Sequence, residues 1–79
     1  MITTLEKLKA GETAIVTDIL GGRTVRNRLN GLGLHPSDKV RILRNGFFGG
    51  PLLIEVHGIE VGIGRGMAEK IQVEIERAP

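Results

Sequence analysis

The sequence feature that most constrains the fold is a single amphipathic helical pattern in residues 23–36. Val25, Leu29 and Leu32 recur at the helical period of roughly 3.6 residues, which predicts one apolar face. Thr24 is the expected N-cap, because its hydroxyl can accept a free backbone amide of the first turn. Glycines and a proline after the apolar stripe predict where the helix ends. No other part of the chain shows a helical pattern of this length, so we expect this face to close one end of a small β core.

Three arginines occupy the other faces of this expected helix: Arg23, Arg26 and Arg28. They are either plain solvated charges or contacts to an acidic partner. Arg28 lies beside the apolar stripe, where it can have a structural role. Arg26 is therefore the preferred candidate for a charge that faces a partner.

Five further segments have the composition of β-strands, because they are rich in β-branched residues or alternate between apolar and polar residues. They are residues 13–20, 39–44, 52–56, 59–63 and 71–76. Single helical turns are expected at residues 5–8 and 67–70. Five short strands, with one α-helix inserted after the first strand, predict a mainly β fold that forms a small, partly open β-barrel.

The alternation along the first of these strands predicts which side chains face the core. Ala14, Val16 and Asp18 are expected on one face of the strand, and Ile19 on the other. The segment 71–76 alternates in the same way, with its isoleucine and valine side chains directed inward.

Composition limits the kind of protein that the chain can be. Its 79 residues form one expected domain, residues 1–79, and the absence of cysteine excludes disulfides and thiolate-bound metal. No apolar run approaches the roughly 20 residues that span a bilayer, so we expect a cytoplasmic protein without membrane insertion. Eleven Lys+Arg against nine Asp+Glu, with only two aromatic residues, argue against a nucleic-acid partner.

Known catalytic and cofactor motifs are absent from the sequence. His35 and His57 each stand next to a proline or a glycine, so they are expected to be solvated turn histidines, with metal binding a remote alternative. The glycine-rich segment 62–66 does not match a phosphate-binding loop and is expected to let a strand bend. We therefore expect no enzyme activity, no cofactor and no bound metal.

The two aromatic residues, Phe47 and Phe48, are adjacent in a glycine-flanked loop that spans residues 45–51. One interpretation is that at least one ring folds back and covers an open end of the barrel. The other is that the rings project as an apolar anchor for a pocket in a partner, where aromatic side chains carry much of the binding energy. The sequence leaves both interpretations open.

Residues spread over most of the chain match the pattern of a known family. The matching positions are Leu5, Leu8, Gly11, Glu12, Ala14, Val16, Ile19, Arg28, Leu29, Leu32, Gly33, Leu34, Pro36, Val40, Ile42, Gly49, Gly50, Pro51, Leu52, Val56, Gly58, Ala68, Ile71 and Val73. In this pattern the chain resembles the FeoA family of ferrous iron transport proteins. The resemblance implies a Src-homology-3-like small β-barrel with one inserted helix. It also implies a cytoplasmic accessory role for FeoB, a membrane transporter with a cytosolic GTP-binding domain.

The chain departs from the family pattern in two places. Ser37 and Asp38 stand where a glycine often follows the proline, so we expect a different turn there. Gly64 stands where many members carry a basic residue, and the neighbouring Arg65 is the candidate substitute.

The leading hypothesis is a non-enzymatic regulatory module that docks on the cytosolic GTP-binding part of a FeoB-type transporter. Its candidate partner-binding residues are Arg26, Arg28, Phe47, Phe48 and Arg65. Two alternatives remain: a small-barrel nucleic-acid-binding module, and a self-assembling domain that forms homo-oligomers through an edge strand or the aromatic loop.

Overall fold

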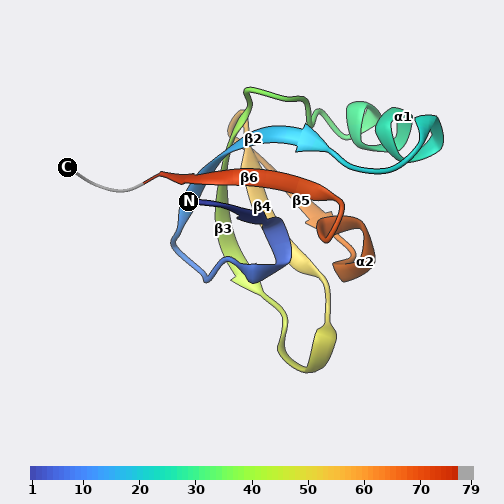
Figure 1. Cartoon of the computed structure of the whole chain (residues 1–79). Helices are drawn as coiled ribbons and strands as arrows, with labels where there is room; N and C mark the ends of the chain where they lie inside the picture. The colour runs from blue at the N-terminus through green and yellow to red at the C-terminus, as the bar shows by residue number, and fades with distance from the viewer. Residues whose placement is uncertain (77–79) are drawn as a thin grey trace.

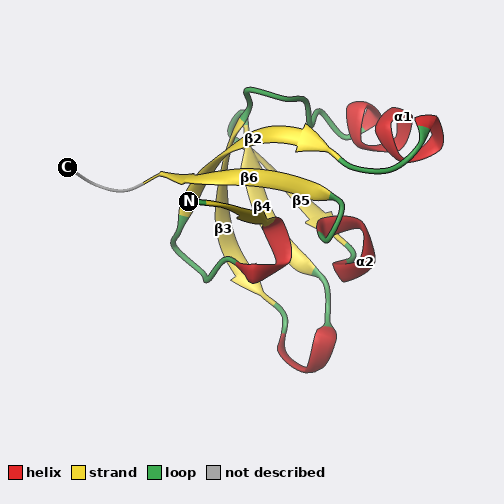
Figure 2. Ribbon diagram, in the orientation of Figure 1, coloured by secondary structure: helices red, strands yellow, loops and turns green. Residues whose placement is uncertain are grey.

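The computed structural model describes residues 1–76, with Phe47 described by its backbone alone. The strands of this part are β1 (Ile2–Thr4), β2 (Thr13–Ile19), β3 (Lys39–Asn45), β4 (Leu52–Val56), β5 (Ile59–Ile63) and β6 (Ile71–Glu76). The α-helices are α1 (Arg23–Gly31) and α2 (Arg65–Ala68), and the short 3-10 helices are η1 (Leu5–Lys7) and η2 (Phe47–Gly49). Figure 2 shows that strands dominate the chain. Neither α-helix of the described part is long and apolar enough to cross a membrane.

The strands form one antiparallel sheet in the order β1-β6-β2-β3-β4-β5. The sheet curves around the core, with β1 and β5 at its two edges, and does not close into a true barrel (Figure 1). This confirms the expected fold class, a mainly β, Src-homology-3-like domain with one inserted helix. The short strand β1 is an addition to the five expected strands, so α1 follows the second strand along the chain.

Among the described side chains, sixteen apolar ones form the core, each at most 2% exposed. They are Leu5, Leu8, Ala14, Val16, Ile19, Leu29, Leu34, Val40, Ile42, Leu52, Ile54, Val56, Ile63, Ala68, Ile71 and Val73. The alternation predicted along β3 and β4 matches this set, because every second residue of a strand faces the same side. Along β6 it matches at Ile71 and Val73, whereas Ile75 is only partly buried and packs against the core. Each large side chain that is fully buried contributes about 1.5–3 kcal/mol of hydrophobic transfer free energy.

The alternation predicted along β2 is wrong at its end. The pairing of β2 with β6 shifts between Val16 and Asp18, so Thr17 is an extra residue in the ladder and is exposed. Such a β-bulge reverses the facing of the residues that follow it. Ile19 is therefore 2% exposed and continues the buried face, whereas Asp18 is only half-buried.

The start of α1 also differs from the prediction. The N-cap is Gly22, in an extended conformation, and not Thr24, which lies inside the first turn. Gly22 begins the helical hydrogen bonding, since its carbonyl accepts the amide of Arg26 at 3.1 Å. Gly21, at φ +109°, makes the preceding turn in a conformation that favours glycine. The tight glycine turn therefore starts the helix two residues earlier than the hydroxyl cap would.

The end of α1 is a Schellman motif that changes which leucine is buried. The amide of Leu34 donates to the carbonyl of Leu29 at 2.9 Å. The amide of Gly33 donates to the carbonyl of Asn30, also at 2.9 Å. Gly33 has φ +87°, as the motif requires. The chain reverses there, so Leu34 packs in the core at 0% exposure. Leu32, which was predicted to face the core, is 43% exposed.

Candidate protein-interaction surfaces

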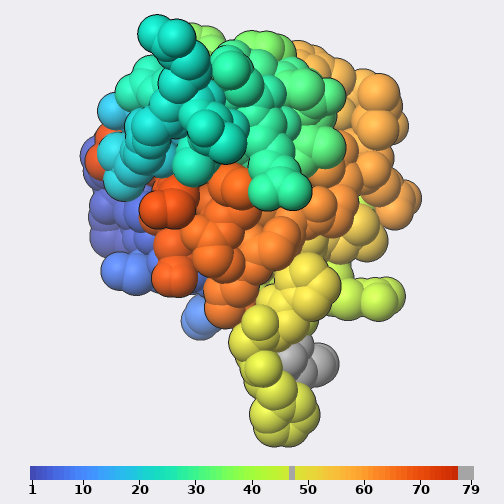
Figure 3. Space-filling view, turned by 90° about the vertical axis from the view of Figure 1, so that its right-hand side faces the viewer, coloured from blue at the N-terminus to red at the C-terminus, as the bar shows by residue number. Residues whose placement is uncertain are grey.

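A surface groove of about 320 Å³ lies between α1 and the connection from β5 to α2. Figure 3 looks onto this side of the molecule, with α1 in teal above the orange β5–α2 segment. The groove is lined by Arg28, Leu32, Gly62, Ile63, Gly64 and Met67. Apart from the glycine and its chain neighbours, no atom of the described residues lies within 4 Å of the position that a Cβ on Gly62 or Gly64 would take, so the lack of these side chains keeps the groove open. The lining is mostly apolar and carries one positive charge, that of Arg28. A lining of this kind is complementary to a segment that presents an apolar side chain next to an acidic one.

The two arginines proposed from the sequence occupy different environments on α1. Arg26 faces Asp18 on β2, with 3.9 Å between Nη2 and Oδ1, and both side chains are about half exposed. An ion pair of this kind typically contributes about 0–1 kcal/mol, so Arg26 remains available to a partner. Arg28 lines the groove beside the exposed Leu32. The structure thus places Arg28, and not Arg26, next to an apolar surface.

The loop between β3 and β4 projects away from the sheet (Figures 1 and 3). Phe48 lies within its 3-10 helix η2 at φ +56°, and its side chain is fully exposed, at 107% of the reference area. The ring of Phe48 therefore does not fold back onto the core. The side chain of Phe47 lies outside the described residues. The role of either ring as an anchor in a partner's pocket stays a prediction.

The base of this loop is held by the side chains of Asn45 and Arg65. Asn45 Nδ2 donates to the backbone carbonyls of Glu6 at 3.0 Å and Leu8 at 2.7 Å. Arg65 Nη2 donates to Asn45 Oδ1 at 2.5 Å and to the carbonyl of Gly46 at 3.0 Å. Arg65, a candidate partner contact from the sequence, thus has an internal role and connects α2 to the loop.

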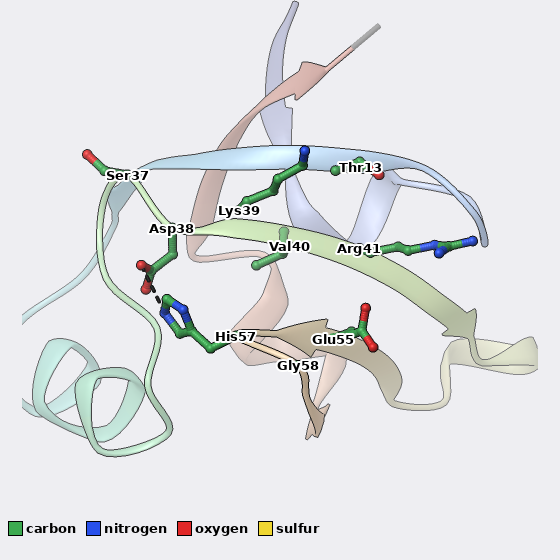
Figure 4. A pocket seen from close by; sticks show the side chains of 9 residues that line it. All are labelled: Thr13, Ser37, Asp38, Lys39, Val40, Arg41, Glu55, His57 and Gly58. Atoms are coloured by element: carbon green, nitrogen blue, oxygen red, sulfur yellow. Dashed lines mark ion pairs between the residues drawn. The ribbon is translucent and has the colours of Figure 1, made fainter. Parts of the chain in front are cut away.

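A third feature is a cluster in which Asp38 contacts both histidines. Asp38 Oδ2 accepts the backbone amide of His35 at 2.8 Å and lies 3.3 Å from its Nδ1. Asp38 Oδ1 lies 3.1 Å from Nε2 of His57, in the turn between β4 and β5 (Figure 4). Partial burial raises the pKa of Asp38, but hydrogen bonds from the amide and ring of His35 and the positive charges of the two histidines outweigh it. The net pKa lies below the ordinary value.

Sequence reasoning missed this cluster, because it treated the two histidines as separate turn residues. The spacing of His35 and Asp38, three residues apart, was the available signal. The contact to His57 arises only when β4 packs beside β3. Asp38 and His57 also line an open pocket of about 520 Å³ with side chains of both charge signs (Figure 4). Among the residues that the structure describes, no group of three or more histidine, cysteine or acidic side chains is arranged to hold a metal ion.

The curved antiparallel sheet, the inserted helix and the exposed groove and loop together define the class of protein to which this chain belongs. The protein is a small Src-homology-3-like β domain with an exposed groove and a projecting loop on its surface. The FeoA domain model matches residues 3–75, which is nearly the whole chain. The chain therefore belongs to the FeoA family of ferrous iron transport accessory proteins, as the sequence pattern indicated.

Individual relatives agree with this assignment. A Methanocaldococcus jannaschii protein assigned as Fe(2+) transport protein A is 39% identical over 66 residues, which cover 84% of this chain and 78% of the relative. The crystal structure of an iron uptake regulatory protein (FeoA) superimposes with a TM-score of 0.88 at 33% identity, covering 96% of this chain and 99% of the other. The solution structure of the FeoA protein from Chlorobium tepidum gives a TM-score of 0.83 at 37% identity, covering 92% of this chain and 70% of that protein.

Proposed function

We propose that this protein is a single-domain, non-enzymatic accessory protein of ferrous iron uptake that docks on the cytosolic GTP-binding part of a FeoB-type membrane transporter. Family membership supports the link to iron transport. The observation that carries the docking proposal is the groove between α1 and the β5–α2 connection, because there an exposed apolar lining adjoins the basic side chain of Arg28 on the helix.

The groove fits a partner segment that presents an aliphatic side chain next to a carboxylate. Leu32 and Met67 supply apolar contact area, which gains free energy in proportion to the area removed from water. Arg28 can donate two parallel hydrogen bonds to one carboxylate, a geometry that adds specificity. The exposed Arg26, two residues before Arg28 on α1, adds positive charge that speeds the encounter with an acidic surface.

The test is a binding titration between the purified protein and the soluble GTP-binding domain of such a transporter, with and without guanine nucleotide. Arg28→Glu and Leu32→Asp are each expected to weaken binding by at least about ten-fold, because arginine contacts carry much of the energy of interfaces and an aspartate at position 32 places an unpaired charge against the apolar lining. Arg23→Glu is the matched control, since Arg23 is exposed on the same helix and does not line the groove.

The control variant separates a local contact from a general charge effect. If Arg23→Glu weakens binding as much as Arg28→Glu does, the groove has no special role. If the folded wild-type protein does not bind the domain in any nucleotide state, the docking proposal is wrong.

A further inference from the structure

The projecting loop presents an apolar surface that neither the core nor the groove uses. Residues 45–54 carry no charged side chain, and Phe48 near the tip is fully exposed. A single exposed apolar residue is ordinary on a protein surface. This one differs because it lies on a projection whose base is fixed by the hydrogen bonds of Asn45 and Arg65. The fixed base keeps the ring away from the body of the protein.

Basic side chains surround the base of the same loop. Arg44 immediately precedes the loop and is exposed. Lys7 and Lys9 are exposed on the η1 segment, which is fastened to the loop because Asn45 Nδ2 donates to the carbonyls of the residues that precede each lysine. Figure 3 shows the yellow loop projecting from the body, with the blue N-terminal segment and the lime-green end of β3 beside its base. The loop is therefore an apolar tip within a basic surround.

Two carboxylates, those of Glu6 and Glu12, lie in the same region and accept hydrogen bonds from neutral donors within the protein. Glu6 is half-buried, and its Oε1 accepts the hydroxyl of Thr4 at 2.6 Å. Glu12 Oε1 accepts the backbone amide of Lys9 at 2.6 Å. Neither carboxylate forms an ion pair with Lys7, Lys9 or Arg44 among the described residues. The three basic side chains outnumber these two carboxylates, so the base of the loop keeps a net positive charge.

We propose that this loop contacts an anionic membrane surface, with Phe48 inserted at the headgroup level and Lys7, Lys9 and Arg44 against the lipid phosphates. Basic residues around an apolar tip are the chemistry that binds anionic lipid, whereas an apolar protein pocket requires no basic surround. The sequence predicted no membrane insertion, and this peripheral contact of one loop goes beyond that expectation. It is also separate from docking on the transporter, since it uses a different surface.

Vesicle flotation tests the proposal, using vesicles of phosphatidylcholine alone and of phosphatidylcholine mixed with phosphatidylglycerol. The wild-type protein is expected to bind the mixed vesicles at low salt, to bind less as salt is added, and not to bind phosphatidylcholine alone. Phe48→Ser should weaken binding at least about ten-fold, and Arg44→Gln by about five-fold. Ile59→Ser is the control for the loss of an exposed apolar side chain outside the loop, because Ile59 is 64% exposed and lies on β5, at the edge of the sheet.

A fluorescent reporter adds a readout that depends on position. The chain contains no tryptophan, so Phe48→Trp introduces a single probe at the tip, and Ile59→Trp introduces the control probe. Anionic vesicles should shift the emission of the first variant to the blue and leave the second unchanged. Circular dichroism checks that each variant is folded.

Two results would overturn the proposal. One is the absence of binding to the mixed vesicles at low salt. The other is vesicle binding that Phe48→Ser does not weaken. If wild type ignores vesicles but Phe48→Ser weakens binding to the transporter's soluble domain, Phe48 is a protein anchor. The lipid proposal then fails while the docking proposal stands.

Discussion

Arg65 Nη2 lies 2.5 Å from Asn45 Oδ1, and this hydrogen bond joins α2 to the end of β3. The two residues are twenty positions apart in the sequence. Through Asn45 the connection extends to the backbone carbonyls of η1, so one pair of side chains fixes three separate segments. The projecting loop thus begins from a rigid base.

Arg65→Met should destabilise the protein by about 2–3 kcal/mol, because the carbonyl of Gly46 and the side chain of Asn45 lose a donor that is charged and partly buried. Urea unfolding measures the change. Arg23→Met is the matched control on an exposed surface, where a change below about 0.5 kcal/mol is expected. Equal effects of the two substitutions would show that the hydrogen bonds of Arg65 do not support the fold.

Asp38→Asn should lower stability near neutral pH by about 1–2 kcal/mol, because it removes the charged acceptor between the two histidines. The pKa of Asp38 is lower in the folded protein than in the unfolded chain. Its contribution is therefore fully present above the unfolded pKa of about 3.9 and is lost as pH falls through the folded pKa.

The pH dependence distinguishes this contribution from a simple packing defect. The stability difference between wild type and Asp38→Asn should shrink as acid unfolding is followed below about pH 4. A stability difference that stays constant down to the lowest pH at which both proteins fold would show that it does not come from the charge of Asp38.

Two glycines near the end of α1 should respond in opposite ways to alanine. Gly33→Ala should destabilise by about 1–2 kcal/mol, since Gly33 is at φ +87° in the Schellman motif. Gly31→Ala should stabilise by up to about 0.5 kcal/mol, because Gly31 is helical and a Cβ there meets nothing within 4 Å. Thermal unfolding of both variants measures the change in stability. A change of the same sign in both variants would contradict the observed helix end.

Thr24→Ala should change stability by less than about 0.5 kcal/mol, because the N-cap of α1 is Gly22. A true hydroxyl N-cap would lose about 1 kcal/mol on the same substitution. Denaturant unfolding of the variant separates the two outcomes, and a loss near the larger value would restore Thr24 as the cap.

Five of the six strands could be predicted from sequence because their signal is local, whereas the short β1 was not expected. In β4, Leu52, Ile54 and Val56 alternate with less buried neighbours, and all three are in the core. The bulge in β2 could not be predicted in this way, since it depends on the pairing with β6. The period of two fails at Ile19 for that reason.

The candidate surfaces were predicted only in part. The exposure of Leu32 depends on which of two neighbouring glycines ends α1, and both were acceptable stop residues by sequence. The internal role of Arg65 depends on Asn45, a residue brought close only by the folded sheet. Residue type indicated the aromatic loop, whereas its projection follows from tertiary hydrogen bonds.

The central claim is that the groove between α1 and the β5–α2 connection is the docking site on the transporter. Amide chemical-shift mapping with the soluble GTP-binding domain of a FeoB-type transporter tests it most directly. We expect the largest shifts at Leu32, Gly62, Gly64 and Met67, with small shifts around His57 at the other end of β5. Shifts centred on His57 and Asp38, or no shifts at all, would contradict the claim.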